Sequence, residues 1–268
     1  MERRGSRMVL ISVVPWGLFP EASMEAAFER TAAAGADGIE LLNFDGFAPE
    51  TLADMANDHG LEIAVAGAIG ETTGIDNVSP AVVDPASTEQ AIEDLHRSID
   101  RAASANARNV LVTVGQYQDE LQPHEQHRAL VEVLRGGASA AEKAGVTVVP
   151  EVLNTRVDHP GYYLNSSYEA YEIVHAVDSP NIGVLYDIYH QQIMEGNIID
   201  NLTANIEYVD HIHFADVPGR HEPGSGELHF ENIFEALDAV GYEGFAGAEL
   251  SPTGDPDETL RAIVNLAT

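Results

Sequence analysis

The sequence predicts an α/β protein folded as a single (β/α)8 barrel over residues 1–268. Apolar, strand-like runs alternate with amphipathic helical patterns along the whole chain. The runs are apolar on both faces, which is typical of parallel strands covered by helices, and eight such units suit a closed barrel of this length. An open doubly wound sheet is the alternative. The segment "VPWGLFPE" after the first strand, however, lacks the Gly-x-Gly-x-x-Gly turn of dinucleotide-binding folds.

Eight short runs rich in β-branched and other apolar residues are the expected strands. In chain order they are Val9–Val14, Gly38–Leu42, Glu62–Gly67, Asn109–Val114, Val146–Glu151, Ile182–Asp187, Val209–Phe214 and Phe245–Leu250. Helical patterns lie between the strands, and several of them end at a glycine of the kind that terminates helices. The clearest helical patterns are residues 24–36, 87–107, 124–145, 166–177, 230–242 and 256–267.

The N-terminus carries paired arginines ahead of an apolar stretch, a pattern that can be a twin-arginine export signal. The stretch is short and runs into Pro20 and Glu21 without a small-residue cleavage site, so we interpret Met8–Val14 as the first strand. No run approaches the roughly 18 apolar residues of a membrane span. The chain has no cysteine, which fits a cytoplasmic protein.

The charge balance is strongly acidic, with 44 Asp and Glu against 13 Lys and Arg and a formal net charge of -31. Such a surface repels polyanions and anionic lipids, so binding to nucleic acid or to a membrane is a poor hypothesis. The acidic residues are spread along helices and are not gathered into a tail or a calcium loop. We interpret them as a halophilic adaptation to a salt-rich cytoplasm, where self-repulsion is screened. An acidic protein of an ordinary cytoplasm is the alternative.

Side chains that can ligate a metal end four consecutive strands, where barrels of this type carry their chemistry. They are Glu151, Asp187, His213 and Glu249. Three carboxylates and an imidazole on one rim would repel one another unless a cation lay between them. Each residue alone also has a structural explanation, such as a helix cap or a core histidine, but four equivalent positions favour the metal. Oxygen donors with one nitrogen suit Mn2+, Mg2+ or Co2+, and Zn2+ is a further option.

Two residues on loops above this rim are candidates for binding substrate. His190 follows Asp187 by three residues, on a loop or a first helical turn, and can reach an oxygen of a bound ligand. A surface histidine is the alternative. Arg220 lies in the Gly- and Pro-rich segment "HFADVPGRHEPGSGEL", which can cover a pocket. It suits a substrate carboxylate or hydroxyl, whereas pairing with Glu222 or Glu227 is the structural alternative.

Further candidates come from the opposite wall and from the other strand ends. Asn154 lies in a second long loop, "EVLNTRVDHPGYYLNS", which we expect to form the other wall of the pocket. Glu40 lies towards the end of the second strand and is another candidate for contacting substrate. Weaker candidates at or just past the ends of strands two to four are Gly67, Thr113 and Gln116.

Four segments together resemble a known family. The segments "PEVLNTRVDHPGYYL", "YDIYHQQIMEGN", "HIHFADVPGRHEPGSGELHF" and "GYEGFAGAEL" look like the signature stretches of the hydroxypyruvate isomerase family. That family belongs to the xylose isomerase-like TIM barrels and is related to ketose 3-epimerases. The resemblance is specific from Glu151 to Pro252 and thins towards the N-terminus to a general barrel pattern with "AAAGADGIELL".

The resemblance implies one divalent metal held by two Glu, one Asp and a His or Gln. Matched residue by residue, it implies that Glu151 and Glu249 are both metal ligands and the catalytic acid/base pair. Asp187 and His213 would complete the metal shell, and His190 and Arg220 would bind substrate oxygens. Hydroxypyruvate isomerases often carry Gln at the position equivalent to 213, whereas this chain has His there, as the epimerases do. The resemblance therefore does not decide between the substrates of the two groups. The resemblance also implies a homo-oligomer, either dimer or tetramer.

These groups predict an isomerase that needs no redox cofactor. Two carboxylates beside a bound hydroxycarbonyl compound can move a proton between adjacent carbons through an enediolate. We expect a small hydroxy-oxo acid as substrate, and the resemblance implies hydroxypyruvate giving tartronate semialdehyde. A ketose 3-epimerase or another sugar isomerase is the alternative, and a metal-dependent sugar-binding protein on an inactive barrel is the non-enzyme alternative. A related type of endonuclease is disfavoured because the chain lacks a basic stripe for DNA.

Overall fold

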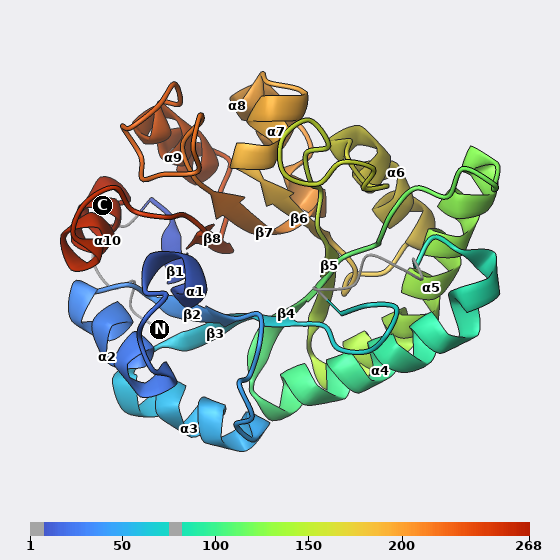
Figure 1. The fold of residues 1–268 in the computed structure, drawn as a ribbon, viewed down its shortest axis with the longest axis horizontal. Coiled ribbons are helices and arrows are strands. Elements are labelled where there is room, and N and C mark those ends of the chain that lie inside the picture. Colours follow the sequence, from blue (N-terminus) through green and yellow to red (C-terminus); the bar gives the residue numbers. More distant parts are fainter. Residues whose placement is uncertain (1–7, 75–81) are drawn as a thin grey trace.

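The computed structural model of the protein describes residues 8–74 and 82–268. Eight parallel strands form one barrel with helices around it (Figure 1). The strands are β1 (Leu10–Val13), β2 (Gly38–Leu41), β3 (Glu62–Gly67), β4 (Ala107–Val112), β5 (Thr147–Pro150), β6 (Val184–Asp187), β7 (Val209–Phe214) and β8 (Phe245–Ala248). The hydrogen-bonded order is β5-β4-β3-β2-β1-β8-β7-β6. Parallel bridges from Val148 to Ile182 and from Glu151 to Leu185 join β5 to β6, so the predicted barrel is confirmed.

The bounds of every strand lie within two residues of the predicted ones. Strand β1 forms from the apolar stretch that follows the paired arginines. Those arginines, Arg3 and Arg4, lie outside the described residues, and with them the start of the export-signal pattern. In the described ranges, no helix has both the length and the apolar character that crossing a membrane requires.

Ten α-helices and two short 3-10 helices are present in the described part of the chain. They are α1 (Pro15–Leu18), α2 (Met24–Ala34), α3 (Pro49–His59), η1 (Pro85–Ser87), α4 (Thr88–Ser104), α5 (Pro123–Ala144), α6 (Ser167–Val177), α7 (Ile188–Met194), α8 (Ile198–Thr203), η2 (Ile206–Tyr208), α9 (Phe230–Ala239) and α10 (Pro256–Leu266). The sequence patterns located α2, α4, α5, α6, α9 and α10. They did not single out α3 or the short helices α1, α7 and α8.

Local capping signals set the ends of several helices. Ser23 begins α2 by accepting a hydrogen bond from the backbone N–H of Ala26, and Gly35 ends that helix in the left-handed region. Asp255 caps α10 in the same way as Ser23 caps α2. Asp187 closes β6 and also caps α7, so the chain passes from strand to helix without a loop at this point. This direct passage brings α7 to the rim of the barrel.

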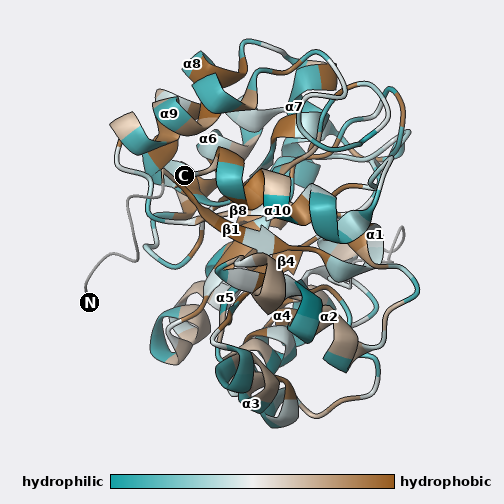
Figure 2. Ribbon diagram, turned by 90° about the vertical axis from the view of Figure 1, so that its left-hand side faces the viewer, coloured by the Kyte–Doolittle hydropathy of each residue, from teal (hydrophilic) through white to brown (hydrophobic). Residues whose placement is uncertain are grey.

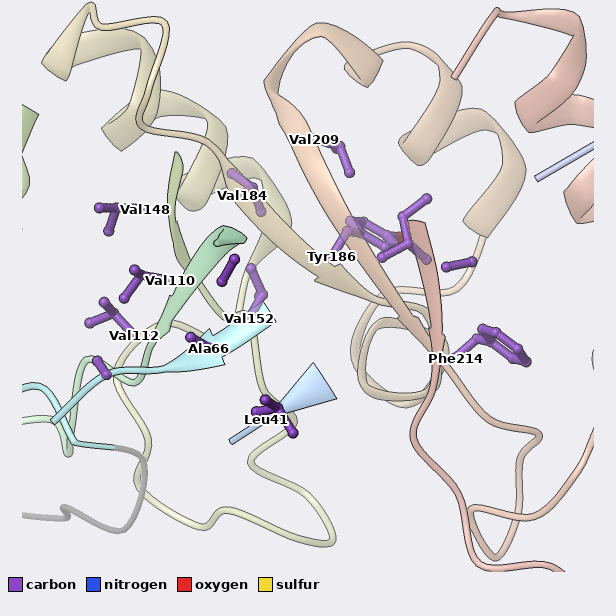
Figure 3. Packing of buried hydrophobic residues seen from close by; sticks show 14 of the residues in the cluster. Leu41, Ala66, Val110, Val112, Val148, Val152, Val184, Tyr186, Val209 and Phe214 are labelled. Carbon is purple, nitrogen blue, oxygen red and sulfur yellow. The ribbon is translucent and has the colours of Figure 1, made fainter. Parts of the chain in front are cut away.

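Two apolar layers lie on the two faces of the strands. Residues such as Val148, Val184 and Phe214 point outward and pack in the core between strands and helices (Figure 3). The next residue on β5 and on β6, Val149 and Leu185, belongs to a smaller cluster with Phe245. Because side chains alternate along a strand, this smaller cluster fills the barrel interior. The strands are mostly apolar, and the surrounding helices also carry hydrophilic residues (Figure 2).

The same alternation directs the polar candidates into the mouth of the barrel. Glu151 follows Val149 by two residues and Asp187 follows Leu185 by two. Both carboxylates therefore lie one layer above the smaller apolar cluster that fills the barrel interior. In the sheet register Asp187 pairs with His213, and His213 pairs with Gly247. The C-terminal ends of β6 and β7 therefore present Asp187 and His213 side by side.

Candidate active site

Four of the predicted residues meet at the C-terminal rim of the barrel. Glu151, Asp187, His213 and Glu249 are between 0% and 7% exposed. Each offers one ligand atom, and these atoms all lie within 4.8 Å of one another. Nδ1 of His213 lies 3.2 Å from Oε1 of Glu151 and 2.9 Å from Oε2 of Glu249. The structure thus brings together the whole predicted ligand set.

Glu40 reaches His213 from across the barrel. Its Oε2 lies 2.8 Å from Nε2 of His213, and its Oε1 lies 3.0 Å from Nε2 of His211 and accepts from the Ser12 hydroxyl at 2.6 Å. A side chain at Gly247 would fill this space, because a Cβ there would lie 1.9 Å from Oε1 of Glu40. Glu40 also lines the cavity, but both of its oxygens are bonded within the barrel.

The contact with Glu40 determines which nitrogen of His213 faces the other carboxylates. Burial tends to raise the pKa of Glu40, but His211 and His213 more than offset it and hold the pKa of this carboxyl well below its usual range. An ionised carboxylate can only accept hydrogen bonds. Nε2 of His213 therefore carries a proton and donates a hydrogen bond to Glu40. Nδ1 is left to face Glu151 and Glu249.

This donor set fits a divalent metal ion. Burial lowers the pKa of His213, but the charges of Glu40 and Glu249 outweigh it and raise the pKa well above its ordinary value. Without a cation, His213 therefore holds a second proton on Nδ1, between two carboxylates. A divalent ion could replace that proton, with the Nδ1 lone pair and the carboxylate oxygens of Glu151, Asp187 and Glu249 as ligands.

Arg220 brings a second positive charge to the same rim. Its Nη2 lies 2.7 Å from Oε2 of Glu249 and 3.3 Å from Oδ2 of Asp187, and its Nε donates to the backbone oxygen of Glu249. Burial tends to raise the pKa of Glu249, but Arg220 and His213 lower it to about 2. At Asp187, burial prevails over the attraction of Arg220, and the pKa is raised.

His190 lies in the first turn of α7, where its backbone N–H donates to Oδ1 of Asp187 at 3.1 Å. Its ring lines the cavity, and Nε2 lies 3.5 Å from Oδ2 of Asp187. Burial and then the charge of Arg220 lower the pKa of His190 to about 3, so the ring is neutral at physiological pH. A surface histidine, the alternative considered above, does not fit a side chain that is 0% exposed.

Asn154 takes a place that differs from the substrate contact expected of it. The residue is 0% exposed, and its side-chain nitrogen lies 2.6 Å from Nδ1 of His190. Among the described residues, it is not one of those that line the cavity. The hydrogen bonds of its amide group go to protein partners, so Asn154 supports His190 from within the protein.

A cavity of about 590 Å³ opens at this rim. Apolar side chains such as Trp16, Phe19 and Leu153 form part of its lining. Its polar lining comes largely from the predicted residues, including the weaker candidates Thr113 and Gln116: Glu40, Thr113, Gln116, Glu151, His190, Arg220 and Glu249. A small molecule in this cavity would meet both glutamates, the neutral imidazole and the guanidinium.

The loop that presents Arg220 is organised around one buried carboxylate, that of Asp216. Its Oδ1 accepts from the backbone N–H groups of Val217 and Leu228, and its Oδ2 accepts from those of Gly224 and Gly226, all at 2.9–3.0 Å. The loop glutamates have partners other than Arg220, since Glu222 accepts from Thr253 and Glu227 from Gln192. The loop can therefore hold Arg220 over the metal-ligand set.

Replacing Asp216 with Asn should loosen this loop without unfolding the barrel. The amide keeps one acceptor oxygen but turns an NH2 group towards two N–H donors, at a cost of about 1–3 kcal/mol for each donor left unsatisfied. We expect faster hydrogen exchange at Gly224 and Gly226, measured by mass spectrometry. Asp238→Asn on the exposed surface of α9 is the matched control. Unchanged exchange in the Asp216 variant would contradict the role given to this carboxylate.

Sequence reasoning missed several residues of the site. Ser12, His211, Asp216 and Gly247 were not singled out. His211 could have been found, because it precedes His213 by two residues and so faces the same side of β7. The contact of Glu40 with His213 joins residues 173 positions apart and has no local signal.

Comparison with known proteins places the chain among barrels of one kind. The xylose isomerase-like TIM barrel family matches residues 28–266. A 2-oxo-tetronate isomerase of Pectobacterium atrosepticum is 29% identical over 247 residues, which are 91% of this chain and 92% of that protein. The hydroxypyruvate isomerase of Escherichia coli is 30% identical over 250 residues, or 91% and 94% of the two chains.

Solved structures give the same fold. The crystal structure of an AP endonuclease of family 2 from Brucella melitensis superposes with a TM-score of 0.88 at 26% sequence identity. The match covers 96% of this chain and 98% of that one. Relatives with different names therefore share this barrel, and the assignment of a reaction has to come from the site.

Proposed function

The chain belongs to the xylose isomerase-like TIM barrel family, and from this premise we propose that it is a metal-dependent isomerase of a small hydroxy-oxo acid. The leading reaction is the conversion of hydroxypyruvate to tartronate semialdehyde in the cytoplasm. The observation that carries the proposal is the pair Glu151 and Glu249, which face the same nitrogen of His213 and both line the cavity. The names of the E. coli and Pectobacterium relatives support the same class of substrate.

The glutamate pair would move the proton that the reaction requires. One carboxylate removes a proton from C3 of hydroxypyruvate, the carbon that bears the hydroxyl, which leaves an enediolate. A proton is then returned to C2, while the hydroxyl proton passes from O3 to O2, so that atoms and charge balance. Burial tends to raise the pKa of Glu249, but Arg220 and His213 hold it at about 2, which keeps this carboxylate ionised.

A divalent ion bound by the four ligands would polarise the substrate carbonyl and stabilise negative charge on its oxygen. Three carboxylates and one imidazole favour Mn2+, Mg2+ or Co2+, with Zn2+ as a further option. Arg220 uses Nε and Nη2 for its contacts with Asp187 and Glu249, which leaves the Nη1 donors of the guanidinium for a substrate carboxylate. His190 turns its ring towards the same cavity.

A ketose 3-epimerase is the second candidate, because the same two glutamates could move protons on opposite faces of a single carbon. His213 is the residue that favours it, since the epimerases resembled by the sequence carry His at this position. DNA as a substrate is disfavoured by the net charge of -31, which opposes the phosphate contacts that dominate affinity for nucleic acids.

A substrate panel tests the proposal. The metal-loaded protein is incubated with hydroxypyruvate, 2-oxo-tetronate and several ketoses, each with Mn2+, Mg2+, Co2+ or Zn2+, and the products are followed by NMR. Assays at low salt and at about 1 M KCl, where the Debye length is about 3 Å, also test whether the acidic surface is a salt adaptation. We expect turnover of a hydroxy-oxo acid, with higher activity in salt. Epimerisation of ketoses alone would favour the second candidate, and binding without turnover would favour a non-catalytic sugar-binding protein.

A further inference from the structure

The Nε2 atom of His190 has no hydrogen-bond partner in the described part of the chain, although it is buried. The ring is 0% exposed and forms part of the cavity lining. Oδ2 of Asp187, a member of the metal-ligand set, lies 3.5 Å from Nε2, at the outer limit for a hydrogen bond. An unsatisfied polar atom in a cavity wall is a position where a ligand can bond. Whether Nε2 would donate or accept there depends on the proton on the ring.

Asn154 decides where that proton lies, because the orientation of its amide is fixed by the backbone. Its Oδ1 accepts from the N–H of Val157 at 2.9 Å and from the N–H of Asp158 at 3.1 Å. Backbone N–H groups can only donate, so the oxygen must be the atom that faces them. The NH2 group of Asn154 is thereby turned the other way, towards Oδ2 of Asp158 and Nδ1 of His190, both at 2.6 Å.

Nδ1 of His190 is therefore an acceptor. It receives the side-chain N–H of Asn154 and, independently, the backbone N–H of Asn154 at 3.2 Å. If Nδ1 carried a proton, its N–H would point at the two N–H donors of Asn154, and none of these three groups could accept a hydrogen bond from another. The carboxylate of Asp158, at 4.0 Å, is too far away to accept such a proton. A neutral imidazole with a bare Nδ1 must carry its proton on Nε2, the atom that lies 3.5 Å from Oδ2 of Asp187.

We propose that His190 is held as the Nε2–H tautomer by Asn154 and donates this hydrogen bond to the substrate oxygen on which negative charge develops. This role rests on the proposed isomerase function. Asn154 is then a positioning residue that never touches the substrate. The acceptor is the carbonyl oxygen of the hydroxy-oxo acid, because Nε2 lies beside Asp187, which belongs to the ligand set of the proposed metal. A neutral donor suits this task, since it strengthens its bond as charge grows and keeps its proton.

Asp158 and Tyr189 support the arrangement from the outer side. Asp158 is 29% exposed at its side chain and accepts from both Asn154 and the phenol of Tyr189. The ring of Tyr189 lies 5.2 Å from that of His190 between centroids, and the guanidinium of Arg220 lies 5.0 Å from the centre of the Tyr189 ring. Tyr189 thus contacts the side chains of both His190 and Arg220, two of the predicted substrate-binding residues.

The test reads the tautomer directly by nitrogen NMR of 15N-histidine-labelled protein loaded with Mg2+, without substrate. Loss of signals in His190→Gln assigns the ring. We expect the shift of an unprotonated nitrogen at Nδ1 and of a protonated one at Nε2. In Asn154→Asp, which keeps the shape, an acceptor oxygen faces Nδ1, and we expect Nδ1 to gain a proton. Asn109→Ala removes another buried amide, one that donates to the backbone oxygen of Ala64, and should leave the His190 signals unchanged.

Steady-state kinetics of the metal-loaded enzyme test the role of the hydrogen bond. Complete loss of one oxyanion donor typically costs about 10²–10³-fold in kcat. Asn154→Ala leaves the backbone donor in place, so we expect kcat to fall at least tenfold with a smaller change in KM. A proton on Nδ1 in the parent protein, or an unchanged ring in Asn154→Asp, would overturn the tautomer assignment whatever the substrate. An unchanged kcat in Asn154→Ala would overturn the positioning role, and inactivity of the parent on every substrate would count against the proposed function alone.

Discussion

Glu151→Gln is expected to lower kcat for the hydroxy-oxo acid by about 10²–10⁴-fold, the range that general acid–base groups contribute. Glutamine keeps the size of the side chain and one oxygen that can face a metal, but it cannot take up or return a proton at ordinary pH. The loss should therefore appear in kcat at saturating metal and substrate. Stopped-assay turnover at several Mn2+ concentrations measures it.

The matched control for this variant is Glu235→Gln, on the exposed face of α9, which should keep the parent activity. Circular dichroism of both variants checks that the barrel is retained. Near-parent turnover by Glu151→Gln would contradict a role for Glu151 in proton transfer and would leave it only the role of a metal ligand.

Mn2+ binding should weaken as the pH falls, because His213, one of the proposed ligands, has a raised pKa. Burial lowers the pKa of His213, but Glu40 and Glu249 raise it well above the ordinary value, so the metal-free ring keeps a proton on Nδ1 to a higher pH than a free imidazole does. Binding must displace that proton. Below the pKa of His213, each unit of falling pH then raises the apparent Kd about tenfold. Isothermal titration calorimetry in buffers of different ionisation enthalpy measures both the affinity and the released proton.

His213→Gln separates this explanation from a general effect of pH. A glutamine can still offer an oxygen to the metal and has no proton to displace, so the variant should bind Mn2+ more weakly at pH 8 but with much less dependence on pH. The same tenfold change per pH unit in His213→Gln would show that a different group, such as Asp187 with its raised pKa, releases the proton.

The fold and the ligand set were accessible from the sequence because both follow local rules. Apolar runs of strand length recur between amphipathic helices, which predicted β1 to β8 to within two residues. Side chains at the ends of successive parallel strands must meet at one edge, and this rule alone predicted the convergence of Glu151, Asp187, His213 and Glu249. Helix α7 was harder to see, because it is short and begins directly at the end of a strand.

The residues that orient the ligands could not be predicted, because their partners are distant in the chain. From the sequence, Glu40 is expected to lie towards the end of an apolar strand and to face the substrate. Its hydrogen bond to His213 depends on the space that Gly247 leaves across the barrel. Asn154 reads as a polar loop residue, and only its turn with Val157 and Asp158 shows that its amide faces inward. The bond of Glu40 is a property of the closed barrel, and the ring that the Asn154 amide meets, that of His190, lies 36 residues further along the chain.

A crystal grown with Mn2+ tests the central claim most directly, through an anomalous difference map recorded near the manganese edge. We expect a strong peak at the mouth of the barrel, bounded by oxygens of Glu151, Asp187 and Glu249 and by Nδ1 of His213, with Nε2 of His213 still bonded to Glu40. A peak at another place, or no peak at the mouth with Mn2+ in excess, would contradict it.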